Sequence, residues 1–379
     1  MSATHLRLEG TVRARSPQDT WNLLKPLLAD FGITRVARLT GLDCLGWPVW
    51  TAIRPAPQTL TATQGKGSTD LLAKISAVME SIELWHAEQP PRIAAQAPAA
   101  DLDLPYPLDA LPLHQHHPDL VTVETDWVTC TGVLTGQAHL LPAGLIHRSA
   151  APRRWEPDLW HTTSTGLACG NSRDEAVLHA LFEVIERDVL AINGQTASRL
   201  LIHPATVADR YCRQLLDSLY RAGMEVEISA VQGAYGLPVC LAFLWSEDFP
   251  LWFAGSGCHT EAPIALSRAL TEAMQSRLTC IAGTRDDLPS QEEVFTAAPQ
   301  PRPRPAPAPW REWSTLMREV NPSPDGGFAE QVAVVAGRVE KVTGYEPLIV
   351  DLSGTASPIA AVKVICPGTR FRVTRAVPR

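Results

Sequence analysis

The chain has 379 residues, of which 45% are hydrophobic and 19% charged, a composition typical of a globular protein with a sizeable core. Its formal net charge of -7 excludes a strong overall basic field, so we expect neither nucleic acid nor a membrane as a partner. The eight cysteines are scattered without a C-x-x-C pair, which predicts single thiols in a reducing compartment rather than a zinc site. No apolar run has the length of a signal peptide or a membrane span, and we therefore expect a cytoplasmic protein.

The N-terminal part of the chain predicts one helix, a group of strands and then a longer helix. A hydroxyl followed by proline, Ser16-Pro17, marks a helix start, and Gly32 marks its end. Strands are predicted at residues 34–39, 48–53 and 59–63. A long helix is predicted at residues 69–88.

Further elements are predicted in chain order: a β-rich passage at 120–163, helices at 173–193 and 207–222, strands at 225–231, 238–245 and 251–255, helices at 263–281 and 328–342, and strands at 347–352 and 360–366. Such a mixture, without a regular β-α-β alternation, predicts an α+β fold. We expect one unit over residues 1–379, with sub-lobes at 1–113, 114–297 and 310–379. A proline-rich surface linker is expected at 298–309.

Three of the predicted helices carry the same unusual polar stripe. Polar residues recur at i, i+4 and i+7 on each, which places them on one helical face. The stripes are Ser76, Glu80 and Glu83; His179, Glu183 and Glu186; and Arg268, Glu272 and Gln275. Apolar residues flank every stripe, so the helices are expected to pack closely and to hold their stripes near a cleft.

Glu80 and Glu83 have no lysine or arginine four residues further along the helix that would neutralise them. For any one helix, a solvated glutamate face is the common explanation. Three similar stripes in one chain instead favour a hard, oxygen-loving cation, and Mg2+ is usually shared with the phosphates of a nucleotide. Glu175 lies one turn before His179 and has two open roles: it is part of a capping box begun by Ser172, or it is a further ligand.

The segment Gly65-Lys66-Gly67 precedes the first striped helix. A Walker phosphate loop requires glycine five residues before Gly65, and that position is Leu60. The segment is therefore not a Walker loop, although a glycine-rich strand-to-helix turn remains able to present backbone N–H groups to an anion.

Taken together, these motifs resemble those of the YcaO family. The matching segments are Gly65-Lys66-Gly67 followed by Ser76, Glu80 and Glu83; residues 166–171 followed by Glu175, Glu183, Glu186 and Arg187; and Arg268, Glu272, Gln275 and Arg277. They follow the family's order and span most of the chain. The resemblance implies an α+β fold in which ATP lies across glutamate-bearing helices beside mixed sheets.

The resemblance also implies roles for individual residues. Mg2+ would be held by Glu80, Glu175, Glu183 and Glu186. ATP would be contacted by Arg13, Thr20, Ser76, Glu83, Asn171, Arg187, Gln275 and Arg277, of which Arg187 and Arg277 would also be catalytic. One position departs from the family pattern: Leu84 stands where the family often has arginine, so that contact is absent or is supplied by Arg277 or Arg285.

Other segments resemble the branch of the family that works with a TfuA partner and is associated with thioamide formation. They include residues 40–43, 282–287 and 362–368, and the chain does not end in the Pro-x-Pro-x-Pro tail frequent among azoline-forming members. We therefore expect a precursor peptide or protein as substrate, a TfuA-like partner and, as in many family members, a homodimer. Azoline or amidine formation is the alternative, and a non-catalytic peptide-binding scaffold is the third interpretation.

The mechanism expected from this resemblance needs no nucleophilic side chain. A sulfide equivalent adds to the peptide carbonyl, and the resulting oxyanion attacks the γ-phosphate of ATP while Arg187 or Arg277 neutralises charge. Loss of phosphate leaves the thioamide. Cys169, which lies in the glycine-rich motif, is expected to be a packed small residue rather than a covalent catalyst.

Overall fold

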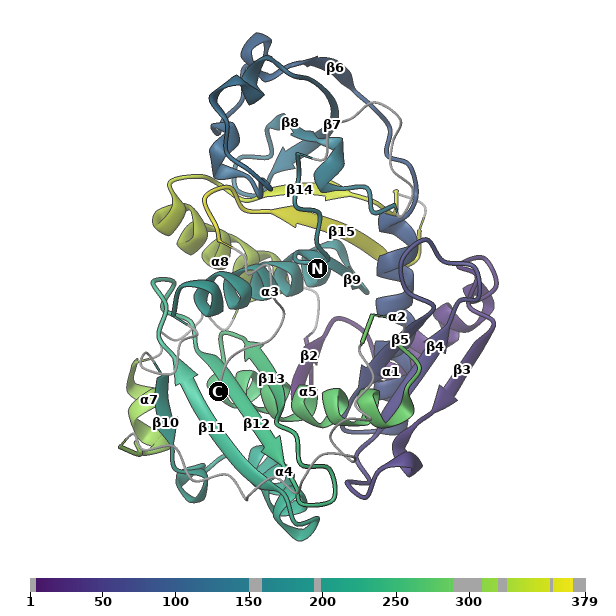
Figure 1. Ribbon diagram of the computed structural model, residues 1–379, viewed down its shortest axis with the longest axis vertical. Coiled ribbons are helices and arrows are strands. Elements are labelled where there is room, and N and C mark those ends of the chain that lie inside the picture. Colours follow the sequence, from purple (N-terminus) through teal and green to yellow (C-terminus); the bar gives the residue numbers. More distant parts are fainter. Residues whose placement is uncertain are drawn as a thin grey trace.

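The computed structural model describes residues 5–149, 159–193, 199–285, 287–288, 309–319, 326–354 and 357–370. Within these ranges the strands form four sheets, and the helices lie between and over them (Figure 1). The smallest sheet pairs β1 (Leu6–Leu8) with β2 (Thr11–Arg13).

A three-stranded antiparallel sheet and two helices form the N-terminal part. Its strands are β3 (Arg35–Arg38), β4 (Val49–Ile53) and β5 (Ala62–Lys66), and α2 (Asp70–Ala87) packs against them with α1 (Pro17–Leu24) beside it. The predicted start of α1 is confirmed, because the Ser16 hydroxyl accepts from the Asp19 N–H and proline follows it.

A six-stranded antiparallel sheet forms the part drawn at the top of Figure 1. Its strands are β6 (Ala95–Pro98), β7 (Glu124–Gly132), β8 (Ala138–Pro142), β9 (Leu167–Gly170), β14 (Leu348–Asp351) and β15 (Ala360–Ile365). The order along the sheet is β6-β7-β14-β15-β9, and β8 pairs with β7. Strands far apart in sequence thus lie side by side.

A four-stranded antiparallel sheet, in the order β10-β11-β12-β13, forms the part below it. Its strands are β10 (Arg199–Ile202), β11 (Glu225–Val231), β12 (Val239–Trp245) and β13 (Phe253–Cys258). One face carries α4 (Arg210–Arg221) and α5 (Ala262–Ala282), and the short α7 (Trp313–Glu319) packs nearby.

Helix α3 (Arg173–Asn193) lies between the two larger sheets, with α8 (Phe328–Thr343) alongside it (Figure 1). Side chains alternate along β12: Val239, Leu241 and Phe243 join the cluster around α3, whereas Cys240 and Ala242 face α4 and α5. Because both faces are covered, every residue of β12 is buried.

Glycines allow the striped helices to approach their strands closely. An added Cβ at Gly65 would lie 2.0 Å from the Ala77 nitrogen of α2, and one at Gly255 would lie 2.2 Å from the Ala269 oxygen of α5. Gly65 is therefore needed for strand-to-helix packing. Gly65 and Lys66 belong to β5, so the predicted strand-to-helix turn before α2 begins at Gly67.

The predicted α+β fold is confirmed, but the predicted sub-lobes are not separate structural units. The six-stranded sheet joins β6 from the first, β7 to β9 from the second, and β14 and β15 from the third. The predicted linker at 298–309 lies outside the described residues except for Pro309. None of the helices in the described residues is long and apolar enough to cross a membrane.

Candidate functional site

A cavity of about 1100 Å³ opens where α2, α3 and α5 face one another. All nine residues of the three polar stripes line it, as do Arg13, Thr20, Asn171, Glu175 and Arg187. The prediction that the stripes face a common cleft is therefore confirmed. The volume lies slightly above the range of about 300–1,000 Å³ typical of small-molecule pockets, which leaves room for two reactants.

Four glutamates from α2 and α3 each receive one hydrogen bond that orients the carboxylate. Backbone N–H groups donate to three of them: Gln64 to Glu80 at 3.3 Å, Cys169 to Glu83 at 2.7 Å and Gly166 to Glu183 at 3.2 Å. The Ser256 hydroxyl donates to Glu186 at 2.5 Å. The donors come from β5, β9, β13 and the turn before β9, so the edges of three sheets aim these carboxylates at the cavity.

Burial makes the ionised form of these glutamates costly. Desolvation raises the pKa of Glu80, Glu183 and Glu186 above the usual range, and it raises the pKa of Glu83 well above it. For Glu83, the neighbouring carboxylates of Glu80 and Glu183 add to the shift. Carboxylates of this kind gain stability from a cation.

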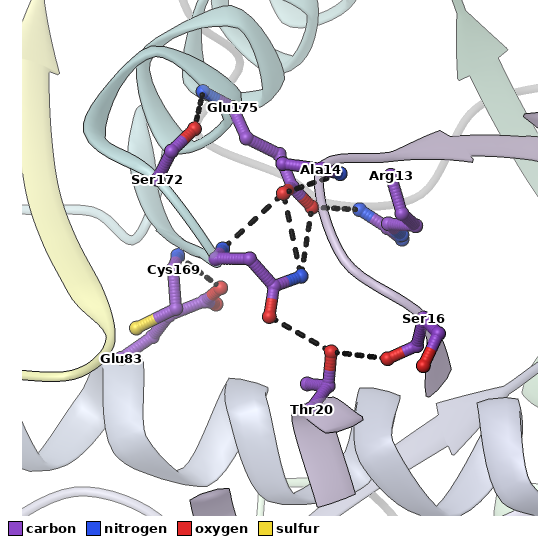
Figure 2. Close-up of polar contacts among 9 residues, drawn as sticks. Arg13, Ala14, Ser16, Thr20, Glu83, Cys169, Ser172 and Glu175 are labelled. Carbon is purple, nitrogen blue, oxygen red and sulfur yellow. Dashed lines mark hydrogen bonds and ion pairs between the residues drawn. The ribbon is translucent and has the colours of Figure 1, made fainter. Parts of the chain in front are cut away.

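A hydrogen-bonded group around Glu175 joins the N-terminal strand to the start of α3 (Figure 2). Glu175 is 3% exposed and accepts from Arg13 Nη1 at 3.3 Å, from Ala14 N at 3.1 Å and from Asn171. Its own N–H donates to the Ser172 hydroxyl at 3.2 Å. The Thr20 hydroxyl donates to Asn171 Oδ1 at 2.8 Å.

These contacts bear on the two roles that the sequence left open for Glu175. The Glu175 N–H makes the helix-capping bond with the Ser172 hydroxyl. The Glu175 side chain lines the cavity, and its role as a metal ligand stays a prediction. Arg13 lies in β2 and shares the cavity wall with Thr20 of α1.

Helix α5 contributes a basic and polar side of the cavity. Lys66 Nζ donates to Gln275 Oε1 at 2.8 Å and lies 3.7 Å from Glu272 Oε2. Gln275 Nε2 donates to the Gln64 carbonyl at 2.8 Å, which ties α5 to β5. Arg187, from α3, is 38% exposed and lies 3.9 Å from Glu183.

The structure corrects the prediction for Arg277. Its side chain is 2% exposed, pairs with Asp43 and Asp248 at 3.0 Å each, and donates to Ser246 at 2.7 Å. It does not line the cavity. The reason is helical geometry: Arg277 follows Gln275 by two residues and therefore faces the opposite side of α5. Arg277 contributes to the fold. Arg285 lines the cavity, and its positive charge opposes the upward shift in the pKa of Glu80.

Several basic residues in or beside the cavity were not assigned from sequence. Arg15, Arg148 and Arg268 line it, and Lys363 is buried just behind its wall. In the described part of the chain, Arg15 Nη1 and Arg268 Nε are buried without a hydrogen-bond partner. A charged residue within the otherwise apolar strand at 360–366 was the signal that could have singled out Lys363.

The donor set fits magnesium held together with a nucleotide. Oxygen donors dominate the acidic side, and the unpaired arginine nitrogens offer contacts to anionic phosphates. Among the described residues, no three His, Cys, Asp or Glu side chains come close enough to hold a metal by themselves. Mg2+ is commonly bound by one or two carboxylates plus phosphates and waters, so the separation is compatible with it.

Fold and site together define an α+β protein with a carboxylate-lined cavity suited to a metal–nucleotide complex. The family model described as "YcaO cyclodehydratase, ATP-ad Mg2+-binding" matches residues 64–370. The chain belongs to the YcaO family, and ATP and Mg2+ are the cofactors of that family.

Curated relatives cover nearly the whole chain. An uncharacterized protein of Mycobacterium tuberculosis is 38% identical over 373 residues, 95% of this chain and 82% of the relative. A protein from the tfuA 3' region of Rhizobium leguminosarum bv. trifolii is 33% identical over 383 residues, 96% of this chain and 89% of the relative.

Solved structures confirm the fold. YcaO from Methanopyrus kandleri, bound with AMPPCP and Mg2+, has a TM-score of 0.74 and 21% identity, and the match covers 99% of this chain and 100% of that one. A heterocyclase in complex with substrate and cofactor has a TM-score of 0.75 and 17% identity. That match covers 98% of this chain but only 55% of the heterocyclase.

Proposed function

We propose that this protein uses ATP and Mg2+ to convert a backbone amide of a ribosomally made peptide or protein into a thioamide, together with a TfuA-type partner. The observation that carries the ATP-dependent part is the set of four buried, individually oriented carboxylates facing a cavity of about 1100 Å³. The relative from a tfuA region supports the thioamide branch.

The residues have distinct roles in this proposal. Mg2+ shared with the nucleotide phosphates would take one or two of its ligands from Glu80, Glu183 and Glu186. Glu175 orders Arg13 and Asn171 at the entrance to α3. ATP supplies the phosphoryl group that turns the amide oxygen into a leaving group while a sulfide equivalent supplies the sulfur. Arg187, beside Glu183 and partly exposed to the cavity, stabilises the charge that develops on the transferred oxygens.

Further nucleotide contacts are assigned to residues that line the same cavity. They are Arg13, Thr20, Ser76, Glu83, Asn171 and Gln275. Cys169 takes no covalent part, because burial raises the pKa of its thiol well above the usual value and its contribution is a backbone N–H.

Mass spectrometry of a reacted peptide tests the product. The purified chain is incubated with its TfuA-type partner, ATP, Mg2+, sulfide and a precursor peptide encoded beside it. Replacement of one oxygen by sulfur is the expected result. Omission of ATP, and the Glu186→Gln variant, serve as controls that should leave the peptide unchanged.

Two other outcomes would replace this proposal. Loss of water from the peptide would indicate azoline or amidine formation, the reaction that the family description names as cyclodehydration. ATP left unhydrolysed with partner and peptide present would indicate a binding scaffold. The oriented, buried carboxylates argue against a scaffold, because they destabilise the fold without a cation.

A further inference from the structure

Lys363 is a charged residue in the middle of a buried strand. It lies in β15, paired with Val350 of β14 on one side and Leu167 of β9 on the other, and it is 3% exposed. Its neighbours Val362 and Val364 pack into the cluster around α3, so the lysine side chain points to the opposite face. An apolar residue is the usual occupant of such a position.

The side-chain Nζ of Lys363 has two acceptors, both in the turn that precedes β9. It donates to the Thr163 carbonyl at 2.6 Å and to the Thr165 carbonyl at 2.8 Å. The turn is closed by Thr165 N–H donating to the Thr163 hydroxyl and by Leu167 N–H donating to the Ser164 carbonyl. Thr163 and Thr165 also line the cavity, so this turn is part of its wall.

One peptide group connects Lys363 to a glutamate of the candidate metal site. The carbonyl of Thr165 receives the lysine hydrogen bond, and the N–H of the same peptide group, on Gly166, donates to Glu183 Oε2 at 3.2 Å. Because the peptide unit is planar and trans, fixing its carbonyl fixes the direction of its N–H. A hydrogen bond donated to the carbonyl also polarises the group and strengthens the N–H as a donor.

The backbone around Gly166 allows little adjustment of this arrangement. Gly166 has φ of +78°, and an added Cβ would lie 2.2 Å from the Val364 carbonyl of β15. Its own carbonyl accepts from the Val364 N–H at 2.7 Å. The turn is thus held by β15 at both Lys363 and Val364, and Glu183 receives a donor from a fixed direction.

We propose that Lys363 is a positioning residue that orients Glu183 through the Thr165–Gly166 peptide group and so sets the Mg2+ affinity of the nucleotide site. This inference rests on the proposed role of Glu183 as a metal ligand. Residues that orient metal ligands typically contribute 10–100-fold to metal affinity. The direction of the change in Mg2+ affinity distinguishes positioning from a simple charge effect. Removal of a nearby positive charge would by itself strengthen Mg2+ binding, whereas loss of the orientation of Glu183 weakens it.

Calorimetry with a non-hydrolysable ATP analogue tests this inference without any peptide. Mg2+ is titrated at a fixed analogue concentration into the wild type, Lys363→Met and Lys363→Arg. We expect Lys363→Met to raise the Mg2+ midpoint by at least about tenfold. Analogue affinity at saturating Mg2+ should change much less, and Lys363→Arg, which keeps donors to both carbonyls, should restore most of the loss.

Two further variants and one metal-free measurement complete the test. Lys74→Met removes a lysine of α2 that contacts Trp21 and does not line the cavity, so its Mg2+ midpoint should equal that of the wild type. Thr163→Val removes only the hydroxyl that closes the turn and should shift the midpoint in the same direction as Lys363→Met. Hydrogen exchange of the segment containing Gly166 should be faster in Lys363→Met than in the wild type, with no metal or nucleotide present.

The outcomes separate this inference from the proposed function. A wild-type chain whose nucleotide binding does not depend on Mg2+ would refute both. Normal Mg2+ dependence in the wild type, with an unchanged or lower midpoint in Lys363→Met, would refute the role of Lys363 alone. Should Lys363→Met fail to fold, an unchanged midpoint in Thr163→Val would refute that role instead.

Discussion

Glu83 provides the sharpest test of the carboxylate site, because the same substitution should stabilise the fold and weaken the function. Its carboxylate is desolvated beside Glu80 and Glu183, which raises its pKa well above the usual value. Glu83→Gln keeps an oxygen that accepts from the Cys169 N–H and removes the buried charge. Substitutions that relieve such strain commonly gain about 0.5–2 kcal/mol.

The size of the thermal shift follows from the chain length. Unfolding entropy of about 2.1 cal/mol/K per residue, over 379 residues, amounts to about 0.8 kcal/mol/K, so 1 kcal/mol moves Tm by about 1.3 °C. We expect Glu83→Gln to raise the Tm of the nucleotide-free protein by one to a few degrees at pH 8. Affinity for the magnesium–analogue complex should fall by at least about tenfold.

The pH dependence adds a second check. A raised folded pKa means that the folded wild type holds a proton that the unfolded chain has lost, so the wild type gains stability as pH falls through this window. The gain in stability of Glu83→Gln over the wild type should therefore become smaller as pH falls from 8 to 5, as measured by scanning calorimetry. Glu124→Gln, at an exposed position of β7, is the control and should show no such trend. A Glu83→Gln variant that is less stable than the wild type at pH 8 would refute the argument.

Three further predictions concern residues around the site. Arg277→Met should destabilise the protein by about 3–5 kcal/mol in urea unfolding, because the substitution leaves the buried Asp43 carboxylate without its partner. The folded variant should keep its nucleotide affinity. A large loss of nucleotide affinity without destabilisation would contradict this prediction. Cys169→Ala should bind the magnesium–analogue complex as the wild type does, since only its backbone N–H reaches Glu83, and an inactive but folded variant would argue for thiol chemistry. Burial lowers the pKa of His259 to about 3, so the wild type loses stability as pH falls from about 6.5 toward 3. The stability of His259→Asn, measured by urea unfolding, should fall less over this range. An equal loss of stability in both proteins would refute the lowered pKa of His259.

Local sequence patterns were sufficient to predict the helices and the faces they present to the site. Spacing of i, i+4 and i+7 is local information, because four residues of helix always return to the same side. The predicted bounds of the helix at 173–193 and of the strand at 225–231 agree with α3 and β11. The same helical geometry also predicts that Arg277 faces away from Gln275. The resemblance nevertheless implied that both residues contact ATP.

The groups that meet across the chain could be identified only once the packing of the sheets and helices was known. Lys363 contacts the Thr163 carbonyl over a separation of 200 residues, and this contact exists because β15 pairs with β9 at the edge of a six-stranded sheet. Position 65 of β5 requires glycine because α2 packs closely against it, and no local glycine pattern reveals this contact. Contacts of this kind depend on strand order and on the distance between packed elements, and a linear pattern contains neither.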